Sequence, residues 1–258
     1  MTTALADSVI MLRRNLKHMI RYPAVTLFMV LMPVAFLLLF VYILGGTIGP
    51  AGHTGRAAYA TFITPGVLAL TAVAATTATA VSIATDMTGG IVARFRTMPI
   101  ARVSVLAGHV GGAVIQTVLG MVAVTAIALL TGFRATTSAT DWLAAAAILI
   151  LFAFALTWLS VALGLAAKSV ESASNAPTPL IILAFLGSGF VLTRSMPTAI
   201  RWFAEYQPFT PVINTVRGLL IGGPIGHNAV IAIVWCLVIT LGSYLWARKL
   251  FSRDLTLS

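Results

Sequence analysis

The chain has 258 residues, of which 59% are hydrophobic and 9% are charged, and its mean hydropathy is +1.02. Soluble domains carry about 25% charged residues, so this composition excludes a water-soluble fold. The net charge of +10 favours contact with anionic lipid head groups over nucleic acid, because the basic residues lie between long apolar runs.

Residues 4–22 form the first segment, which is both amphipathic and basic. Its apolar residues recur at three- and four-residue spacing, and its cations occupy the rest of the helical wheel. This pattern predicts a helix lying in the membrane interface, with its cations toward lipid phosphates. A frayed basic tail is the alternative. The cations are Arg13, Arg14, Lys17 and Arg21.

Six apolar runs follow, and a helix needs about 20 apolar residues to cross the bilayer core. We therefore predict an all-α integral membrane protein with six transmembrane helices. The fifth run is the shortest and begins with Pro177 and Pro179, which early helical positions tolerate. The predicted spans are residues 24–44, 59–85, 103–131, 142–166, 177–193 and 229–247.

The motif Gly187-Ser188-Gly189 in the fifth run has two interpretations. It is either part of an intramembrane serine protease or a set of small residues that lets helices pack closely. The second interpretation is favoured, because small residues are common at helix contacts in membranes.

Eleven of the sixteen basic residues fall on one side of this six-span arrangement and five on the other. An excess of Lys and Arg marks the cytoplasmic side, so both termini are expected to be cytoplasmic.

Residues 194–215, on the external side, contain aromatic residues suited to the head-group level. We expect two short amphipathic helices there, broken at Pro208 and Pro211, that re-enter the outer leaflet.

Several kinds of chemistry are missing from the sequence. None of the three lysines lies in the Gly-Lys-Ser/Thr context of a phosphate-binding loop, and Cys236 is the single cysteine. All six carboxylates fall at span ends or in loops, whereas coupled carriers keep ionisable groups inside their spans. His109 is either a proton relay or a residue that packs on a neighbouring helix, and packing is favoured. We predict no catalytic residue and no metal site, so energy has to come from a partner.

Residues 86–102 form a short basic segment between two apolar runs. Asp86 is expected to cap a helix start, Gly89 and Gly90 to permit a bend, and Pro99 to stop the helix. The segment has the features of a cytosolic helix that plugs into a groove on a soluble partner. A plain positive-inside loop is the alternative. The remaining residues of interest are Ile91 and Phe95 on the apolar face, and Arg94, Arg96 and Arg102 around it.

Four stretches carry a resemblance to a known family. They are RYPAVTLFMVLMPVAFLLLF, FITPGVLAL, DMTGGIVARFRTMPIARVSVLAGHV and QPFTPVINTVRGLL. Together they resemble the permease subunits of type 2 ABC exporters, in particular the daunorubicin-resistance branch. The resemblance implies that residues 86–102 are the coupling helix, residues 4–22 the interfacial elbow helix and residues 194–215 the re-entrant helices.

The resemblance also implies partners and a location. It implies a separate ABC nucleotide-binding ATPase that carries ATP and Mg, a second copy of this chain in a 2+2 complex, and a multi-pass place in the bacterial cell membrane. The expected function is export of a lipophilic or amphipathic drug-like compound. The alternatives are export of a lipid or lipid-linked glycan, and a membrane scaffold or sensor without transport.

Substrate contacts are expected from the first, second and fifth spans, and the second is rich in hydroxyl side chains. Each hydroxyl either binds a ligand or bonds the backbone of its own helix, and the second is favoured for any one of them. The possible substrate path comprises Thr71, Thr76, Thr79, Ser82 and Ser188.

Overall fold

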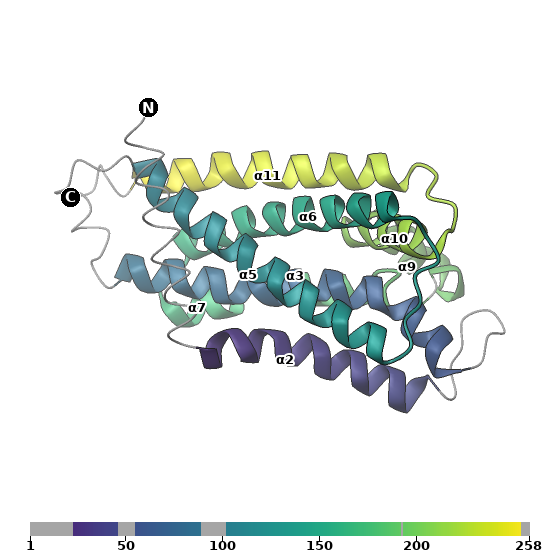
Figure 1. Ribbon diagram of the computed structural model, residues 1–258. Helices are drawn as coiled ribbons and strands as arrows, with labels where there is room; N and C mark the ends of the chain where they lie inside the picture. The colour runs from purple at the N-terminus through teal and green to yellow at the C-terminus, as the bar shows by residue number, and fades with distance from the viewer. Residues whose placement is uncertain (1–22, 46–54, 89–101, 192, 254–258) are drawn as a thin grey trace.

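The computed structural model describes residues 23–45, 55–88, 102–191 and 193–253. Within these ranges all regular structure is helical, as the sequence predicts (Figure 1). The elements are α2 (Pro23–Leu39), η1 (Phe40–Leu44), α3 (Arg56–Thr88), α5 (Arg102–Leu130), α6 (Ala139–Ala166), α7 (Val170–Asn175), α8 (Thr178–Leu186), η3 (Thr193–Ser195), α9 (Thr198–Tyr206), α10 (Phe209–Ile221) and α11 (Asn228–Arg253).

Helix α3 lies at the centre of the bundle. It packs against α2, α5 and α6, and α6 separates it from α11 (Figure 1). Four helices of the described ranges, α3, α5, α6 and α11, are long and apolar enough to cross a membrane. They fall where the sequence predicts the second, third, fourth and sixth spans.

The first predicted span, residues 24–44, corresponds to α2 followed directly by the π-helix η1. Pro23 is the first residue of α2, a position where proline costs little because the N–H it lacks has no intrahelical partner. The helix ends where the backbone N–H of Gly45 donates to the Phe40 carbonyl oxygen over 3.0 Å.

The fifth predicted span, residues 177–193, is not one continuous helix. Helix α8 has nine residues, about 14 Å at the usual rise, which is half of the hydrocarbon core. The six-residue helix α7 precedes it, and the chain leaves the helical conformation at Gly187. Pro177 lacks the N–H that a continuous helix needs, which explains the junction between α7 and α8.

The expected re-entrant region contains α9 and α10. These helices separate at Gln207 and Pro208, as predicted, but Pro211 does not break α10. Pro211 is the third residue of that helix, where an N–H has no acceptor within the helix. Gly222 then ends α10 with φ of +81°, a left-handed conformation that glycine adopts without strain.

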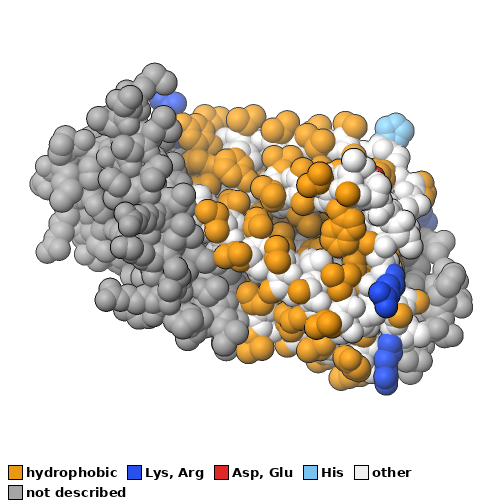
Figure 2. Space-filling model, viewed as in Figure 1, with side chains coloured by type: hydrophobic (Ala, Val, Ile, Leu, Met, Phe, Trp, Pro, Cys, Tyr) orange, Lys and Arg blue, Asp and Glu red, His pale blue; other side chains and the backbone are white. Residues whose placement is uncertain are grey.

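The sides of the bundle are apolar. In Figure 2, hydrophobic side chains cover the middle of the visible face, and basic side chains stand towards its two ends. Helix α11 illustrates this, since Val230, Val234, Leu237 and Leu241 are all exposed. Such a surface suits contact with lipid, where apolar side chains need no burial inside the protein.

A close backbone contact joins the centre of the bundle to the loop after α8. A Cβ atom added to Gly66 of α3 would stand 2.6 Å from the Cα of Gly189. Gly189 therefore allows a close backbone contact with α3, although it lies in the loop after α8 and not within a helix. The T-shaped pair of Phe152 and Phe209, with ring centroids 5.2 Å apart, packs α10 on α6.

Candidate functional site: the two ends of the bundle

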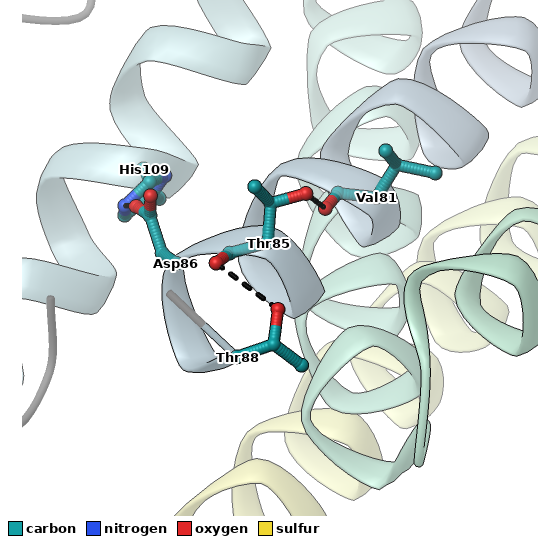
Figure 3. A network of polar contacts seen from close by, with 5 residues as sticks. All are labelled: Val81, Thr85, Asp86, Thr88 and His109. Carbon is teal, nitrogen blue, oxygen red and sulfur yellow. Dashed lines mark hydrogen bonds and ion pairs between the residues drawn. The ribbon is translucent and has the colours of Figure 1, made fainter. Parts of the chain in front are cut away.

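The Asp86 end of the bundle is where α3 finishes and α5 begins, on either side of residues 89–101. Asp86 does not stand before a helix, as the sequence analysis expected, but in the last turn of α3. Its Oδ2 lies 3.0 Å from Nε2 of His109 on α5 (Figure 3). A carboxylate is unfavourable beside the negative end of a helix dipole, and the imidazole provides the compensating partner. His109 thus packs on a neighbouring helix, as favoured.

Threonine hydroxyls bond backbone carbonyl groups in the last two turns of α3, near Asp86. Thr85 Oγ1 donates to the carbonyl oxygen of Val81 over 2.8 Å, and Thr88 Oγ1 donates to that of Ala84 over 2.9 Å. Figure 3 shows Thr85 and Thr88 on the same terminal turn as Asp86. Thr88 Oγ1 also lies 3.3 Å from the carbonyl oxygen of Thr85, which is one of the last four carbonyls of α3 and has no donor within the helix.

The remaining predicted coupling residues lie outside the described ranges, except that Arg102 is the first residue of α5. Gly89, Gly90, Ile91, Arg94, Phe95, Arg96 and Pro99 all belong to the undescribed segment, as do the interfacial cations Arg13, Arg14, Lys17 and Arg21. What the structure adds is the spatial relationship of the two ends of the segment, joined by the Asp86–His109 pair.

The predicted path residues on α3 do not form a polar cluster. Thr71, Thr76 and Thr79 are buried, and their hydroxyls donate to backbone carbonyl oxygens three or four residues earlier in the same helix, over 2.6–3.0 Å. Ser82 is exposed. The alternative that these hydroxyls bond their own helix therefore holds for the three threonines.

Ser188 belongs to a polar cluster around Arg217 of α10. Ser188 Oγ donates to Asn214 Oδ1 over 2.7 Å. Arg217 Nη2 donates to the carbonyl oxygens of Ser188, over 2.7 Å, and Phe62, over 3.2 Å, and Nη1 donates to Asn214 Oδ1 over 3.1 Å. One side chain on α10 thus ties together α3 and the loop after α8.

A cavity of about 510 Å³ opens beside this cluster, at what we term the Arg217 end of the bundle. It lies where α3 begins, where α5 connects to α6 and where α10 finishes. Arg217 and Arg134 are its charged lining residues. The rest of the lining is Ala57, Ala58, Thr61, Phe62, Gly132, Ile221, Gly222 and Gly223.

A second cavity, of about 350 Å³, is almost entirely apolar and lies between α3, α5, α6 and α10. Thr125 and the indole of Trp142 are its polar lining groups. Neither cavity is lined by any of the five predicted path residues. The remaining residues of the apolar cavity are Leu68, Val118, Met121, Val122, Ala126, Leu129, Ala145, Ala146, Leu149, Ile150 and Leu220.

Sequence reasoning missed the role of Arg217 and the partner of Asp86. In the sequence TVRGLL, Arg217 stands between apolar residues, and Asn214 lies three positions earlier. Residues three apart share one face of a helix, so this pattern indicates a buried cation with a polar neighbour. The pairing of Asp86 with His109 has no such local signal, because the two residues are 23 positions apart in the sequence.

Comparisons with known proteins agree with this architecture. Residues 8–221 match the ABC-2 type transporter family. The chain is also 31% identical over 223 residues to the daunorubicin resistance ABC transporter permease protein of Streptomyces coeruleorubidus, which covers 85% of this chain and 77% of that protein. The family match includes the Asp86–His109 pair and helices α2 to α10, and it ends before α11. The chain therefore belongs to the ABC-2 type transporter family, and it is a multi-pass membrane transporter subunit of the permease type.

Proposed function

We propose that this chain is the permease subunit of an ATP-driven exporter, with six membrane crossings and both termini in the cytoplasm. Two copies would assemble with two copies of a separate ABC ATPase, which binds ATP and Mg. Closure of the ATPases would then switch the permease between inward- and outward-facing states. The family membership of residues 8–221 supports this arrangement.

The observation that carries the proposal is the Asp86–His109 pair. It holds the last turn of α3 against α5, the two helices that flank residues 89–101. A segment fixed at both ends transmits a push along two helices at once. We propose that residues 86–102 are the coupling helix, with Phe95 as its anchor and Arg94 and Arg96 at the rim of a groove on the ATPase.

We propose that the exported compound is lipophilic or amphipathic. The relative from Streptomyces coeruleorubidus is named for daunorubicin resistance, and the apolar cavity of about 350 Å³ has a size typical of small-molecule sites. Its lining has no charged residue, so it favours a molecule with an extended apolar part. Thr71, Thr76 and Thr79 of α3 do not line this cavity.

The test is binding of the cognate ATPase to the full chain in lipid nanodiscs. Truncating a buried interface anchor costs about 2 kcal/mol or more, so Phe95→Ala is expected to weaken binding about thirtyfold. Arg96→Ala should weaken it less, and increasingly so as salt is raised. Phe203→Ala is the control, because this phenylalanine is exposed on α9. If Phe95→Ala binds the ATPase normally and supports normal transport, the assignment of residues 86–102 as the coupling helix is wrong.

A second measurement separates export from a scaffold or sensor role. The isolated chain should bind no ATP, whereas the complex in lipid should hydrolyse ATP faster when an amphipathic drug such as daunorubicin is added. Stimulation by a lipid-linked glycan instead would favour the glycan-exporting alternative. An ATPase rate that no added compound changes would favour the scaffold.

A further inference from the structure

The Arg217 end of the bundle has more positive than negative charge. It carries Arg56 and Arg134 besides Arg217, and the carboxylates nearest in sequence, Asp141 and Glu205, are already engaged. Asp141 Oδ2 accepts hydrogen bonds from the Ser138 hydroxyl and backbone N–H, over 2.7 and 3.1 Å. Glu205 Oε1 pairs with Arg201 over 2.8 Å. Residues 46–54, which lie outside the described ranges, contain no Asp or Glu.

Arg217 is the most enclosed of these cations, and each partner it has in the described ranges is neutral. Its three hydrogen bonds go to two backbone carbonyls and an amide oxygen, and its guanidinium lies 4.4 Å from the ring centroid of Phe62. Its Nε is buried and has no hydrogen-bond partner among the described residues. A guanidinium has five N–H donors, so hydrogen-bonding capacity and a full positive charge both remain unmatched.

Arg134 brings a second cation to the same cavity. Its backbone N–H donates to Thr61 Oγ1 over 3.4 Å, which fixes the loop after α5 against α3, and its side chain is exposed. The cavity wall between the two arginines is made of small or apolar residues, among them Ala57, Ala58 and Ile221. No carboxylate lines this cavity within the described ranges.

We infer that this cavity binds the phosphate of an anionic phospholipid head group. Guanidinium groups recognise phosphate oxygens through charge-assisted, often paired hydrogen bonds. The volume of about 510 Å³ accommodates a head group with its glycerol, and the apolar wall suits the first part of the acyl chains. The site lies at the end of the crossing helices, where head groups lie in a bilayer. A free phosphate ion shares the oxyanion chemistry but would leave the apolar wall without a partner.

The experiment titrates the full chain in detergent with short-chain phosphatidylglycerol and follows thermal unfolding, because a ligand of the native state raises the midpoint. Phosphatidylcholine of the same chain length and inorganic phosphate are the two comparison probes. Native mass spectrometry counts the bound lipids. We expect saturable stabilisation by phosphatidylglycerol, and at least tenfold weaker effects of the other two.

Two variants test the site without removing the structural bonds of Arg217. Arg134→Gln should weaken phosphatidylglycerol binding about tenfold, the usual effect of losing one charged hydrogen bond. Ala58→Glu places a carboxylate in the cavity beside the arginines and should abolish binding, whereas Ala58→Gln, of the same size, should retain it. Arg201→Gln is the control, since it removes one positive charge outside the cavity.

The inference fails if Arg134→Gln and Ala58→Glu both bind phosphatidylglycerol within twofold of the unmodified chain. It also fails if inorganic phosphate stabilises the chain through Arg134 while phosphatidylglycerol does not. Discrimination between Ala58→Glu and Ala58→Gln supports it, because the two variants differ in charge and not in bulk.

Discussion

The Nη2 atom of Arg217 donates to the carbonyl oxygen of Ser188 over 2.7 Å, and this bond connects two segments 29 positions apart. It closes the loop after α8 onto α10, while the bond to Phe62 brings in α3. A bent loop inside a membrane protein has free carbonyl groups that water does not reach, and they need internal donors. Arg217 donates to one such carbonyl, that of Ser188, so it stabilises the break that ends α8.

We predict that Arg217→Met destabilises the protein by about 2–4 kcal/mol, because it leaves the carbonyls of Ser188 and Phe62 without this donor. Thermal unfolding of the purified chain in detergent measures the effect. The control Arg201→Met removes an exposed ion pair and should cost less than about 1 kcal/mol. Equal losses in the two variants would contradict the buried role of Arg217.

We predict that Gly66→Ala destabilises the bundle by about 1–3 kcal/mol, because its methyl group would meet the backbone of Gly189 at 2.6–2.9 Å. A backbone neighbour cannot move aside as a side chain does. Gly242→Ala on α11 is the matched control, since nothing lies within 4 Å of its added Cβ, and alanine there should be neutral or slightly stabilising. The unfolding midpoints of the two variants give the comparison.

The Asp86–His109 pair should show energetic coupling. Asp86→Asn, His109→Gln and the double variant form a cycle, and contacting residues in such cycles couple by about 0.5–3 kcal/mol. We expect this coupling in the free energy of unfolding of the chain and also in the drug-stimulated ATPase rate of the complex. Glu171→Gln, which removes an exposed carboxylate on α7, serves as the control. Additive single effects in both measurements would show that the pair does not hold the segment.

The topology prediction is testable by cysteine labelling in a Cys236→Ala background. Thr97→Cys should react with a membrane-impermeant maleimide only from the cytoplasm, and Ser138→Cys only from outside, because 11 of 16 basic residues favour that orientation. Ser138 is exposed, so its position gives a clear signal. Labelling of both positions from the same face would rule out the six-crossing arrangement.

Much of the fold was predictable because hydropathy is a local property. The long helices α3, α5, α6 and α11 begin or end within a few residues of the predicted spans, apart from the C-terminal extension of α11. The family resemblance, drawn from short motifs, is confirmed by the match over residues 8–221. The Pro208 boundary was also predictable, since proline lacks the N–H that a helix interior needs.

The sequence by itself therefore determined the membrane class, the helical elements and the family, because each depends on neighbouring residues. Only the tertiary structure decided which polar groups meet. Three contacts join residues that are far apart along the chain. They are the bond of Arg217 to Ser188, the pair of Asp86 and His109, and the contact of Gly66 with Gly189. Composition and spacing do not encode such encounters, because they depend on how the helices pack in three dimensions.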